Sequence, residues 1–222
     1  MFFQEAFKKL DEEQKESFYK TVFMNDPSNH AALLRKAYYA TKFKSMGKKV
    51  YIGAGVKIVN PEYISIGENV CISDGVTLIA RGEGGITIGN NVSLRDRVYL
   101  DTENKDTGYI RIGDHVYIGT GTTLFGHMGL EIGDHALLAQ NITLTPYSHY
   151  YDDPNANIIT QGGRCQKVTI GRDVYIGMGV CIMYSGSVGD GSVVGAGSVV
   201  VKPIPEYSVA VGNPAKVIKK RG

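Results

Sequence analysis

The sequence predicts a mainly β repeat fold in which three short strands close each turn of a coil. The 222-residue chain contains 28 glycines without a low-complexity tract, and from about residue 50 an aliphatic residue recurs every six positions. Strings such as IGENVC, IGNNVS, IGDHVY and IGRDVY repeat the same pattern of glycine and polar residues. A six-residue period fits one extended stretch plus a tight turn, and such repeats bury their apolar faces against their neighbours.

The aliphatic positions form triplets, one for each expected coil, and we expect their side chains to point into the shaft. They are Ile66, Ile72 and Leu78; Ile88, Leu94 and Leu100; Ile112, Ile118 and Leu124; Ile132, Leu138 and Leu144; Ile170, Ile176 and Ile182; and Val188, Val194 and Val200. The turns between them require positive φ, which Gly, Asn and Asp tolerate best. His115 and His135 occupy this place in the repeat, so we interpret them as turn residues rather than metal ligands or catalytic groups.

The spacing is interrupted four times, each time after the third member of a triplet. The interruptions follow Leu78, Leu100, Leu124 and Leu144, and the last extrudes a loop over residues 145–167. All four therefore fall on one edge of the coil. Insertions gathered on one face of a repeat protein usually build its binding face.

Residues 1–48 are expected to form a helical segment, because apolar residues from Phe3 and Phe7 to Val22 keep an approximate three-to-four spacing. A break at residues 25–29 precedes a second helix, for which Ser28 or Asn29 is the expected cap. The coil is expected over residues 49–205, and residues 206–222 are expected to close it.

Composition and charge argue against several kinds of partner. The net charge of +2 does not indicate the basic surface that binds nucleic acid or an anionic membrane. No apolar run approaches the ~20 residues of a membrane helix, and the start of the chain lacks a signal-peptide pattern. The three cysteines show no metal-ligand spacing. We therefore expect a cytoplasmic protein with no nucleic-acid partner and no membrane insertion.

With these repeats, residues 50–218 resemble the hexapeptide-repeat acyltransferases, which implies a left-handed parallel β-helix. Residues 132–162, IGDHALLAQNITLTPYSHYYDDPNANIITQG, are similar to the segment of the maltose, galactoside and capsule-type O-acetyltransferases that enters a long loop carrying the catalytic histidine. Residues 194–221 are similar to the terminal coil of that family. The resemblance implies an acetyl-CoA-dependent O-acetyltransferase that acts on a sugar or polysaccharide precursor, as a homotrimer with active sites between subunits.

By this resemblance His149 is the general base, and an imidazole with a pKa near 6.5 suits that role. Asp152, Asp153 or a backbone carbonyl would hold its ring in one orientation. The residues expected to line the acceptor cleft are Asn141, Tyr147, Tyr150 and His127. Gly119 stands where the maltose and galactoside enzymes carry an acceptor-contacting Asn, which argues against those two acceptors.

The resemblance places the co-substrate acetyl-CoA in a groove between two β-helices, with an oxyanion donor near Met178 or Gly179. The residues expected to contact it are Gly177, Met178, Gly179, Ser185, Gly195, Ala196, Lys202, Lys216 and Lys219. The chemistry requires no metal, and the histidine spacing is wrong for the zinc enzymes of this fold. The alternatives are an N-acetyltransferase acting on an amino-sugar nucleotide, a xenobiotic or antibiotic acetyltransferase, and a non-catalytic scaffold.

Overall fold

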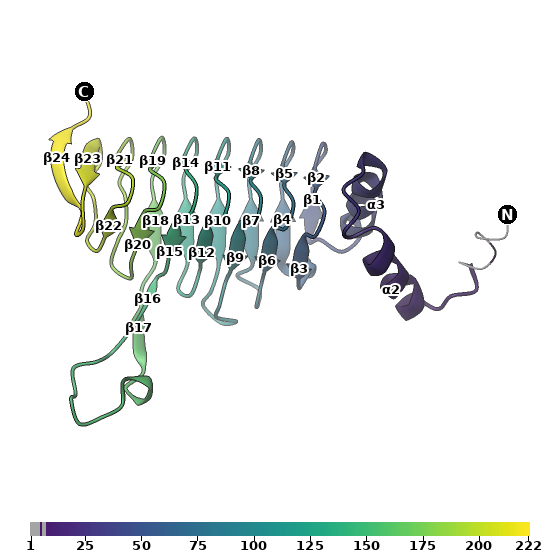
Figure 1. Ribbon diagram of the computed structural model, residues 1–222, viewed down its shortest axis with the longest axis horizontal. Helices are drawn as coiled ribbons and strands as arrows, with labels where there is room; N and C mark the ends of the chain where they lie inside the picture. The colour runs from purple at the N-terminus through teal and green to yellow at the C-terminus, as the bar shows by residue number, and fades with distance from the viewer. Residues whose placement is uncertain (1–4, 6–7) are drawn as a thin grey trace.

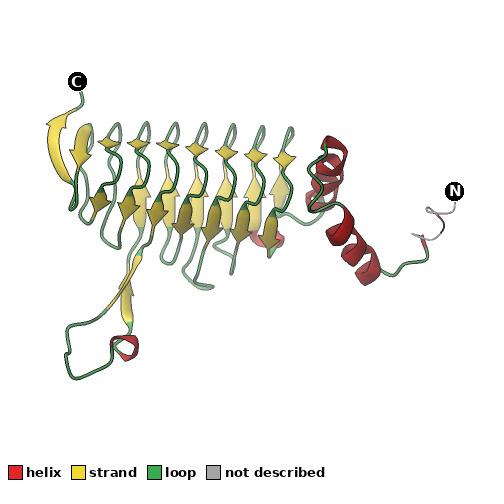
Figure 2. Ribbon diagram, in the orientation of Figure 1, coloured by secondary structure: helices red, strands yellow, loops and turns green. Residues whose placement is uncertain are grey.

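In its described residues the chain forms a parallel β-helix with two α-helices at its N-terminal end (Figures 1 and 2). The computed structural model describes residue 5 and residues 8–222, so Phe3 and Phe7 lie outside the described residues. Both the mainly β fold and the parallel β-helix predicted from the repeat are confirmed.

Three parallel sheets form the faces of the coil. Sheet A contains β1 (Ser45–Met46), β4 (Ile64–Ile66), β7 (Ile86–Ile88), β10 (Ile110–Ile112), β13 (Leu130–Ile132) and β18 (Val168–Ile170). Sheet B contains β2 (Tyr51–Ile52), β5 (Cys71–Ile72), β8 (Ser93–Leu94), β11 (Tyr117–Ile118), β14 (Leu137–Leu138), β19 (Tyr175–Ile176), β21 (Val193–Val194), β23 (Ser208–Val211) and β24 (Lys216–Lys220). Sheet C contains β3 (Lys57–Val59), β6 (Thr77–Ile79), β9 (Tyr99–Asp101), β12 (Thr123–Phe125), β15 (Thr143–Leu144), β20 (Cys181–Ile182) and β22 (Val199–Val200).

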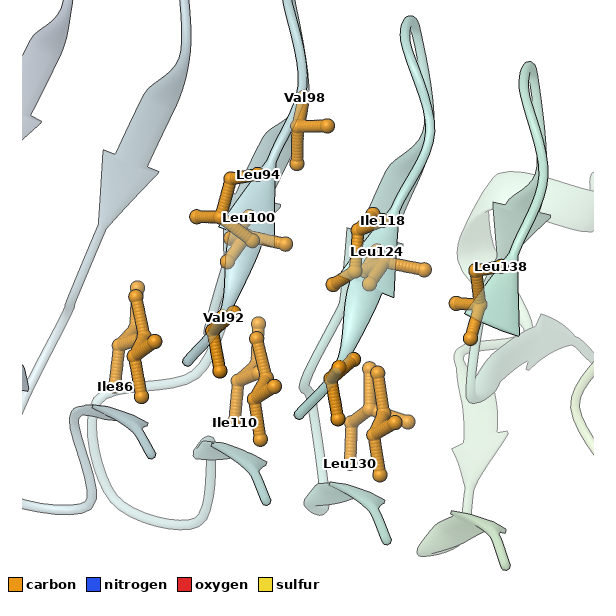
Figure 3. Packing of buried hydrophobic residues seen from close by; sticks show 14 of the residues in the cluster. Ile86, Val92, Leu94, Val98, Leu100, Ile110, Ile118, Leu124, Leu130 and Leu138 are labelled. Atoms are coloured by element: carbon orange, nitrogen blue, oxygen red, sulfur yellow. The ribbon is translucent and has the colours of Figure 1, made fainter. Parts of the chain in front are cut away.

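The predicted aliphatic positions all lie in the core, beside further buried aliphatic residues such as Val92 and Ile86. In sheet A, Ile88 pairs with Ile66 on one side and with Ile112 on the other, so identical positions stack from coil to coil. Each predicted position is at most 3% exposed, and Figure 3 shows several of these side chains stacked inside the coil. Burial of one such side chain is worth about 1.5–3 kcal/mol, so the ladder supplies much of the stability.

The turn residues adopt the predicted conformation. His115 and His135 have φ values of 58° and 60°, and their rings are stacked with centroids 4.9 Å apart. The preceding glycine is also required, because a Cβ at Gly113 would collide with the Asp134 carboxylate of the next coil. That carboxylate accepts a hydrogen bond from the Asp114 amide at 2.8 Å. The side chain of one turn therefore caps the backbone of the turn before it.

The helices close the N-terminal end of the coil (Figure 1). They are α2 (Glu12–Val22) and α3 (Asn29–Ala40), and Ser28 caps α3 by accepting a hydrogen bond from the Ala31 amide at 3.2 Å. Arg35, only 1% exposed, donates hydrogen bonds to the carbonyls of Ile52, Phe23 and Asp26. One guanidinium thus ties α3 both to the first coil and to the segment before it.

At the other end, β24 runs antiparallel to β23 and covers the last strand of sheet B. Arg221 forms an ion pair with Asp173 at 3.0 Å. Neither helix in the described part of the chain is long and apolar enough to cross a membrane.

The four predicted insertions all join sheet C to sheet A, at what we call the C–A edge. They follow β6, β9, β12 and β15, as the interrupted spacing indicates. The last is more ordered than predicted, because β16 (Tyr147–His149) and β17 (Gly163–Cys165) form an antiparallel hairpin that projects from the coil (Figure 1). A short 3-10 helix, Ile158–Thr160, lies near its tip.

Candidate active site

His149 lies at the end of β16, directly opposite Gly163 on β17. Its side chain is exposed, on a hairpin that stands clear of the coil. The backbone pairing explains how an exposed loop histidine is held in place. The hairpin is therefore the main support of the candidate base. The spacing of the repeat alone does not predict this hairpin.

Tyr147 contacts both neighbouring imidazoles. Its ring meets His149 edge-on, with centroids 4.9 Å apart and planes at 86°. It is stacked on His127, with centroids 5.2 Å apart and planes at 19°. A Cβ at Gly163 would collide with the Tyr147 hydroxyl, so glycine is required there for the tyrosine to lie across β17.

The ring contacts continue from His127 to Phe125 on the same coil and to Tyr99 on the preceding coil. His127 lies 6.1 Å from Phe125 in an edge-to-face arrangement, and Phe125 lies 5.9 Å from Tyr99, again between centroids. All three side chains are half-buried. We define Tyr99, Phe125, His127 and Tyr147 as the ring series; it runs from sheet C to the C–A edge and ends at His149.

The environment of His127 disfavours the charged form of its imidazole. Burial lowers its pKa, and the Asp101 and Glu103 carboxylates oppose that effect only in part. Its Nδ1 atom is buried without a hydrogen-bond partner among the described residues. His127 thus has an unused polar atom next to the candidate base.

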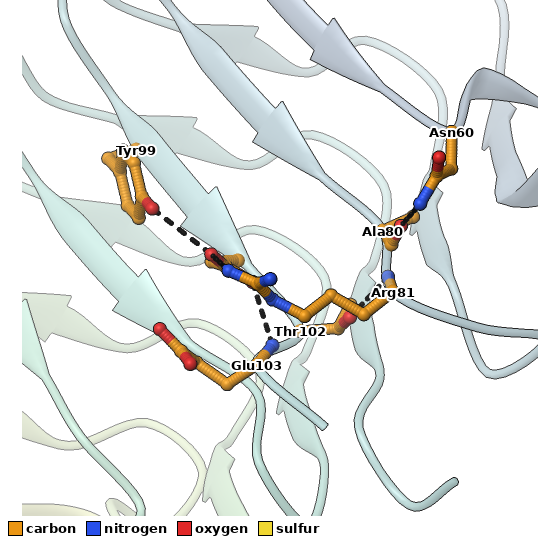
Figure 4. Close-up of polar contacts among 7 residues, drawn as sticks. Asn60, Ala80, Arg81, Tyr99, Thr102 and Glu103 are labelled. Atoms are coloured by element: carbon orange, nitrogen blue, oxygen red, sulfur yellow. Dashed lines mark hydrogen bonds and ion pairs between the residues drawn. The ribbon is translucent and has the colours of Figure 1, made fainter. Parts of the chain in front are cut away.

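An ion pair between the exposed Arg81 and the buried Asp101 supports the far end of the ring series (Figure 4). Asp101 is fully buried and accepts hydrogen bonds from Arg81 Nε at 2.8 Å and Arg81 Nη2 at 2.7 Å. The Tyr99 hydroxyl and the Glu103 amide also donate to this carboxylate, at 3.0 Å and 2.8 Å. The paired geometry satisfies a charge that would otherwise be costly to bury.

The opposite side of the hairpin carries different chemistry. Arg164 pairs with Ser148 across the hairpin, and its guanidinium lies 4.9 Å from the Tyr184 ring centroid and 5.8 Å from that of Tyr150. Tyr184 follows β20, in the coil after the hairpin. The hairpin therefore stands between His127 of the preceding coil and Tyr184 of the following coil.

The group that orients His149 remains a prediction. Among the described residues, the structure records a ring contact with Tyr147 for the His149 side chain and no hydrogen bond. The Asp153 carboxylate accepts from the Asn155 amide at 2.9 Å. Asp152 is exposed.

The predicted donor contacts lie on two edges of the chain. Ser185 and Lys202 follow sheet C strands and share the C–A edge with the hairpin. The turns from sheet B to sheet C, which we call the B–C edge, hold Gly177, Met178, Gly179, Gly195 and Ala196. Sheet C separates these edges within one chain. Lys216 and Lys219 lie exposed on β24.

The predicted acceptor residues are not all brought together. His127, Tyr147 and Tyr150 lie on the C–A edge. Asn141 is instead a turn residue on the B–C edge, with φ of 56°.

Sequence reasoning missed Arg81, Asp101 and Arg164. The repeat offered a signal for Arg81 and Asp101, because each follows the third aliphatic residue of its coil.

Comparison with known proteins agrees with this architecture. The family model for the hexapeptide repeat of succinyl-transferase matches residues 109–146 and 167–202. The galactoside O-acetyltransferase of Escherichia coli is 35% identical over 136 residues, which is 60% of this chain and 63% of that protein. The dTDP-4-amino-4,6-dideoxy-D-glucose acyltransferase of the same species is 30% identical over 165 residues, which is 71% of this chain and 82% of that protein.

A solved structure shares the fold. The N-acyltransferase AntD of Bacillus cereus, in complex with dTDP and coenzyme A, superposes with a TM-score of 0.61 at 25% identity, covering 85% of this chain and 89% of that one. The chain belongs to the hexapeptide-repeat acyltransferase family. It spans 54% and 63% of the lengths of two of the curated relatives it matches.

Proposed function

We propose that the chain transfers an acetyl group from acetyl-CoA to a hydroxyl of a sugar or polysaccharide precursor, with His149 as the general base. The observation that carries this proposal is the position of His149, exposed at the end of a paired hairpin and flanked by the ring series. The name of the galactoside O-acetyltransferase relative supports the same reaction class.

The reaction is a direct transfer. The neutral His149 imidazole removes the proton from the acceptor hydroxyl as its oxygen attacks the thioester carbonyl. The C–O bond forms, the C–S bond breaks through a tetrahedral intermediate, and the imidazolium returns the proton to the thiolate of coenzyme A. A positioned base of this kind contributes about 10²–10⁴-fold to the rate.

The donor is assigned to a groove between two copies of the chain in a homotrimer. His149 lies on the C–A edge, whereas Met178 and Gly179, the predicted source of the oxyanion donor, lie on the B–C edge. Backbone N–H groups suit this role, because they stabilise the oxyanion without reorganising. A neighbouring copy supplies the B–C edge that a single chain does not bring to its own His149.

A second candidate function is acyl transfer to the amino group of a nucleotide-linked sugar. It is favoured by the relative named dTDP-4-amino-4,6-dideoxy-D-glucose acyltransferase. The AntD structure, with dTDP and coenzyme A bound, favours the same class of acceptor.

Thiol release from acetyl-CoA tests the proposal. Purified protein and the His149→Ala variant are compared with a panel of sugars, amino sugars and nucleotide sugars. The proposal predicts release that depends on a hydroxyl acceptor and falls at least about 100-fold in the variant. Release with amino sugars alone would support the second candidate instead, and no release with any acceptor would refute both.

A further inference from the structure

The two sides of the hairpin differ in shape and charge. Tyr147 and His149 face the preceding coil, where the ring series extends to Tyr99. Arg164 lies on the other side, against Tyr184 of the following coil. The two faces of the hairpin thus offer different chemistry, and His149 lies on the face that carries the ring series.

The ring series has the form of a carbohydrate-binding surface. Its rings are half-buried, and neighbouring centroids lie between 5.2 and 6.1 Å apart. Aromatic rings offer large, rigid contact faces, and sites lined by them add a few polar groups that fix orientation. Here the exposed imidazole of His149, at the end of the series, is such a polar group.

The series is longer than one sugar requires. A single sugar with its hydroxyl at His149 would contact Tyr147 and His127. Phe125, the last residue of β12, lies 6.1 Å beyond His127 on the same coil, and Tyr99, the first residue of β9, lies a further 5.9 Å away on the coil before it, both distances between ring centroids. Successive coils are spaced like neighbouring strands, about 4.8 Å apart, so these two rings would meet a second sugar unit.

Local charge disfavours a phosphorylated acceptor on this side. The charged groups that act on His127 are the Asp101 and Glu103 carboxylates. The nearby Arg81 guanidinium donates two hydrogen bonds to Asp101, so this pair is neutral overall and the Glu103 carboxylate carries the remaining charge. A nucleoside diphosphate placed on the ring series would therefore meet negative rather than positive charge.

We propose that the acceptor is a neutral saccharide of at least two sugar units, bound along the ring series with the reacting unit at His149. This inference rests on the proposed function and narrows its acceptor class. It disfavours nucleotide-linked sugars, the acceptors of the second candidate function.

The test measures kcat/KM for acetylation of acceptors of increasing length. The probes are glucose, maltose and maltotriose, galactose, galactobiose and galactotriose, and UDP-glucose and UDP-galactose. For the wild type we expect kcat/KM to rise about tenfold from a monosaccharide to its disaccharide, the scale of one added aromatic contact. The UDP-sugars should be no better than the monosaccharides.

The variant Phe125→Leu keeps an apolar side chain but removes the aromatic face. It should reduce the ratio of kcat/KM for a disaccharide to kcat/KM for its monosaccharide from about tenfold towards one. Tyr51→Ala, an exposed tyrosine on β2 of sheet B, is the matched control and should retain the length dependence.

Acetylation that is independent of length, or fastest with a UDP-sugar, would overturn the inference while leaving acetyl transfer intact. A Phe125→Leu variant that keeps the full length dependence would also overturn it. An absence of thiol release with every acceptor would instead count against the proposed function itself, so the two failures are distinguishable.

Discussion

The Tyr147 ring meets the His149 imidazole edge-on, with centroids 4.9 Å apart. The same tyrosine is stacked on His127, so the orientation of the candidate base depends on an aromatic contact that is itself supported from the coil. Among the described residues, no carboxylate contacts His149. We infer that Tyr147 is a positioning residue.

Replacement of this ring should reduce turnover more than binding. Tyr147→Leu removes the edge-on contact, so we expect kcat to fall about 10- to 100-fold, because a loosely held base is misplaced in the transition state. The KM for the acceptor should rise less than kcat falls, because the ring also contacts the sugar, and the KM for acetyl-CoA should not change. Tyr147→Phe keeps the ring and should retain most of the activity. Steady-state kinetics of both variants check this, and equal losses in the two would contradict a role for the ring.

The burial of His127 predicts a pH-dependent stability. Burial lowers its pKa in the folded protein, whereas the unfolded chain binds the proton near pH 6.5. Above that pH both states are neutral and His127 contributes nothing to the pH dependence. As the pH falls below about 6.5, the unfolded state takes up the proton more readily, so the free energy of unfolding decreases.

Thermal unfolding at pH 7.5 and pH 5.5 checks this prediction. His127→Phe should lose less stability on acidification than the wild type does. His30→Gln replaces an exposed histidine on α3 and should behave like the wild type. Identical acid sensitivity in all three proteins would show that His127 is not responsible.

Arg35 should be essential for docking of the N-terminal helices. Arg35→Met leaves the carbonyls of Ile52, Phe23 and Asp26 without their charged donor. We expect a loss of about 3 kcal/mol in the free energy of unfolding, on the scale of buried hydrogen bonds to a charged group. Urea denaturation measures it. Lys36→Met on the same helix is the control and should change stability by less than about 0.5 kcal/mol.

The repeat predicted most of the coil because its physics is local. A six-residue period specifies which side chain points inward, and positions such as Leu94 and Ile176 are fully buried as expected. The same period located the C–A edge and the turn conformation of His115. These features follow from stacking between neighbouring coils, and the repeat pattern that specifies this stacking can be read from one sequence.

The candidate site was predicted less completely, because it depends on contacts between loops of different coils. The stacking of His127 on Tyr147 joins two insertions whose conformations no periodicity describes. The antiparallel hairpin was expected only as a loop. Asn141 was grouped with His127, but it lies on another edge because its place in the six-residue period is a turn from sheet B to sheet C.

The central claim is that each active site combines the C–A edge of one copy with the B–C edge of another. Two variants separate these contributions: His149→Ala removes the base, and Ala196→Trp fills the exposed position on the B–C edge. Each variant alone should be trimeric and inactive. Sizing chromatography and acetyl-CoA thiol release measure these two properties.

Mixed trimers made by co-expression of the two variants provide the most direct test. With equal, random mixing, one site in four receives an intact C–A edge from one copy and an intact B–C edge from its neighbour. The account therefore predicts recovery of about a quarter of the wild-type activity in a closed ring of identical interfaces. Mixed trimers that stay inactive would contradict it, because both edges would then have to come from the same chain.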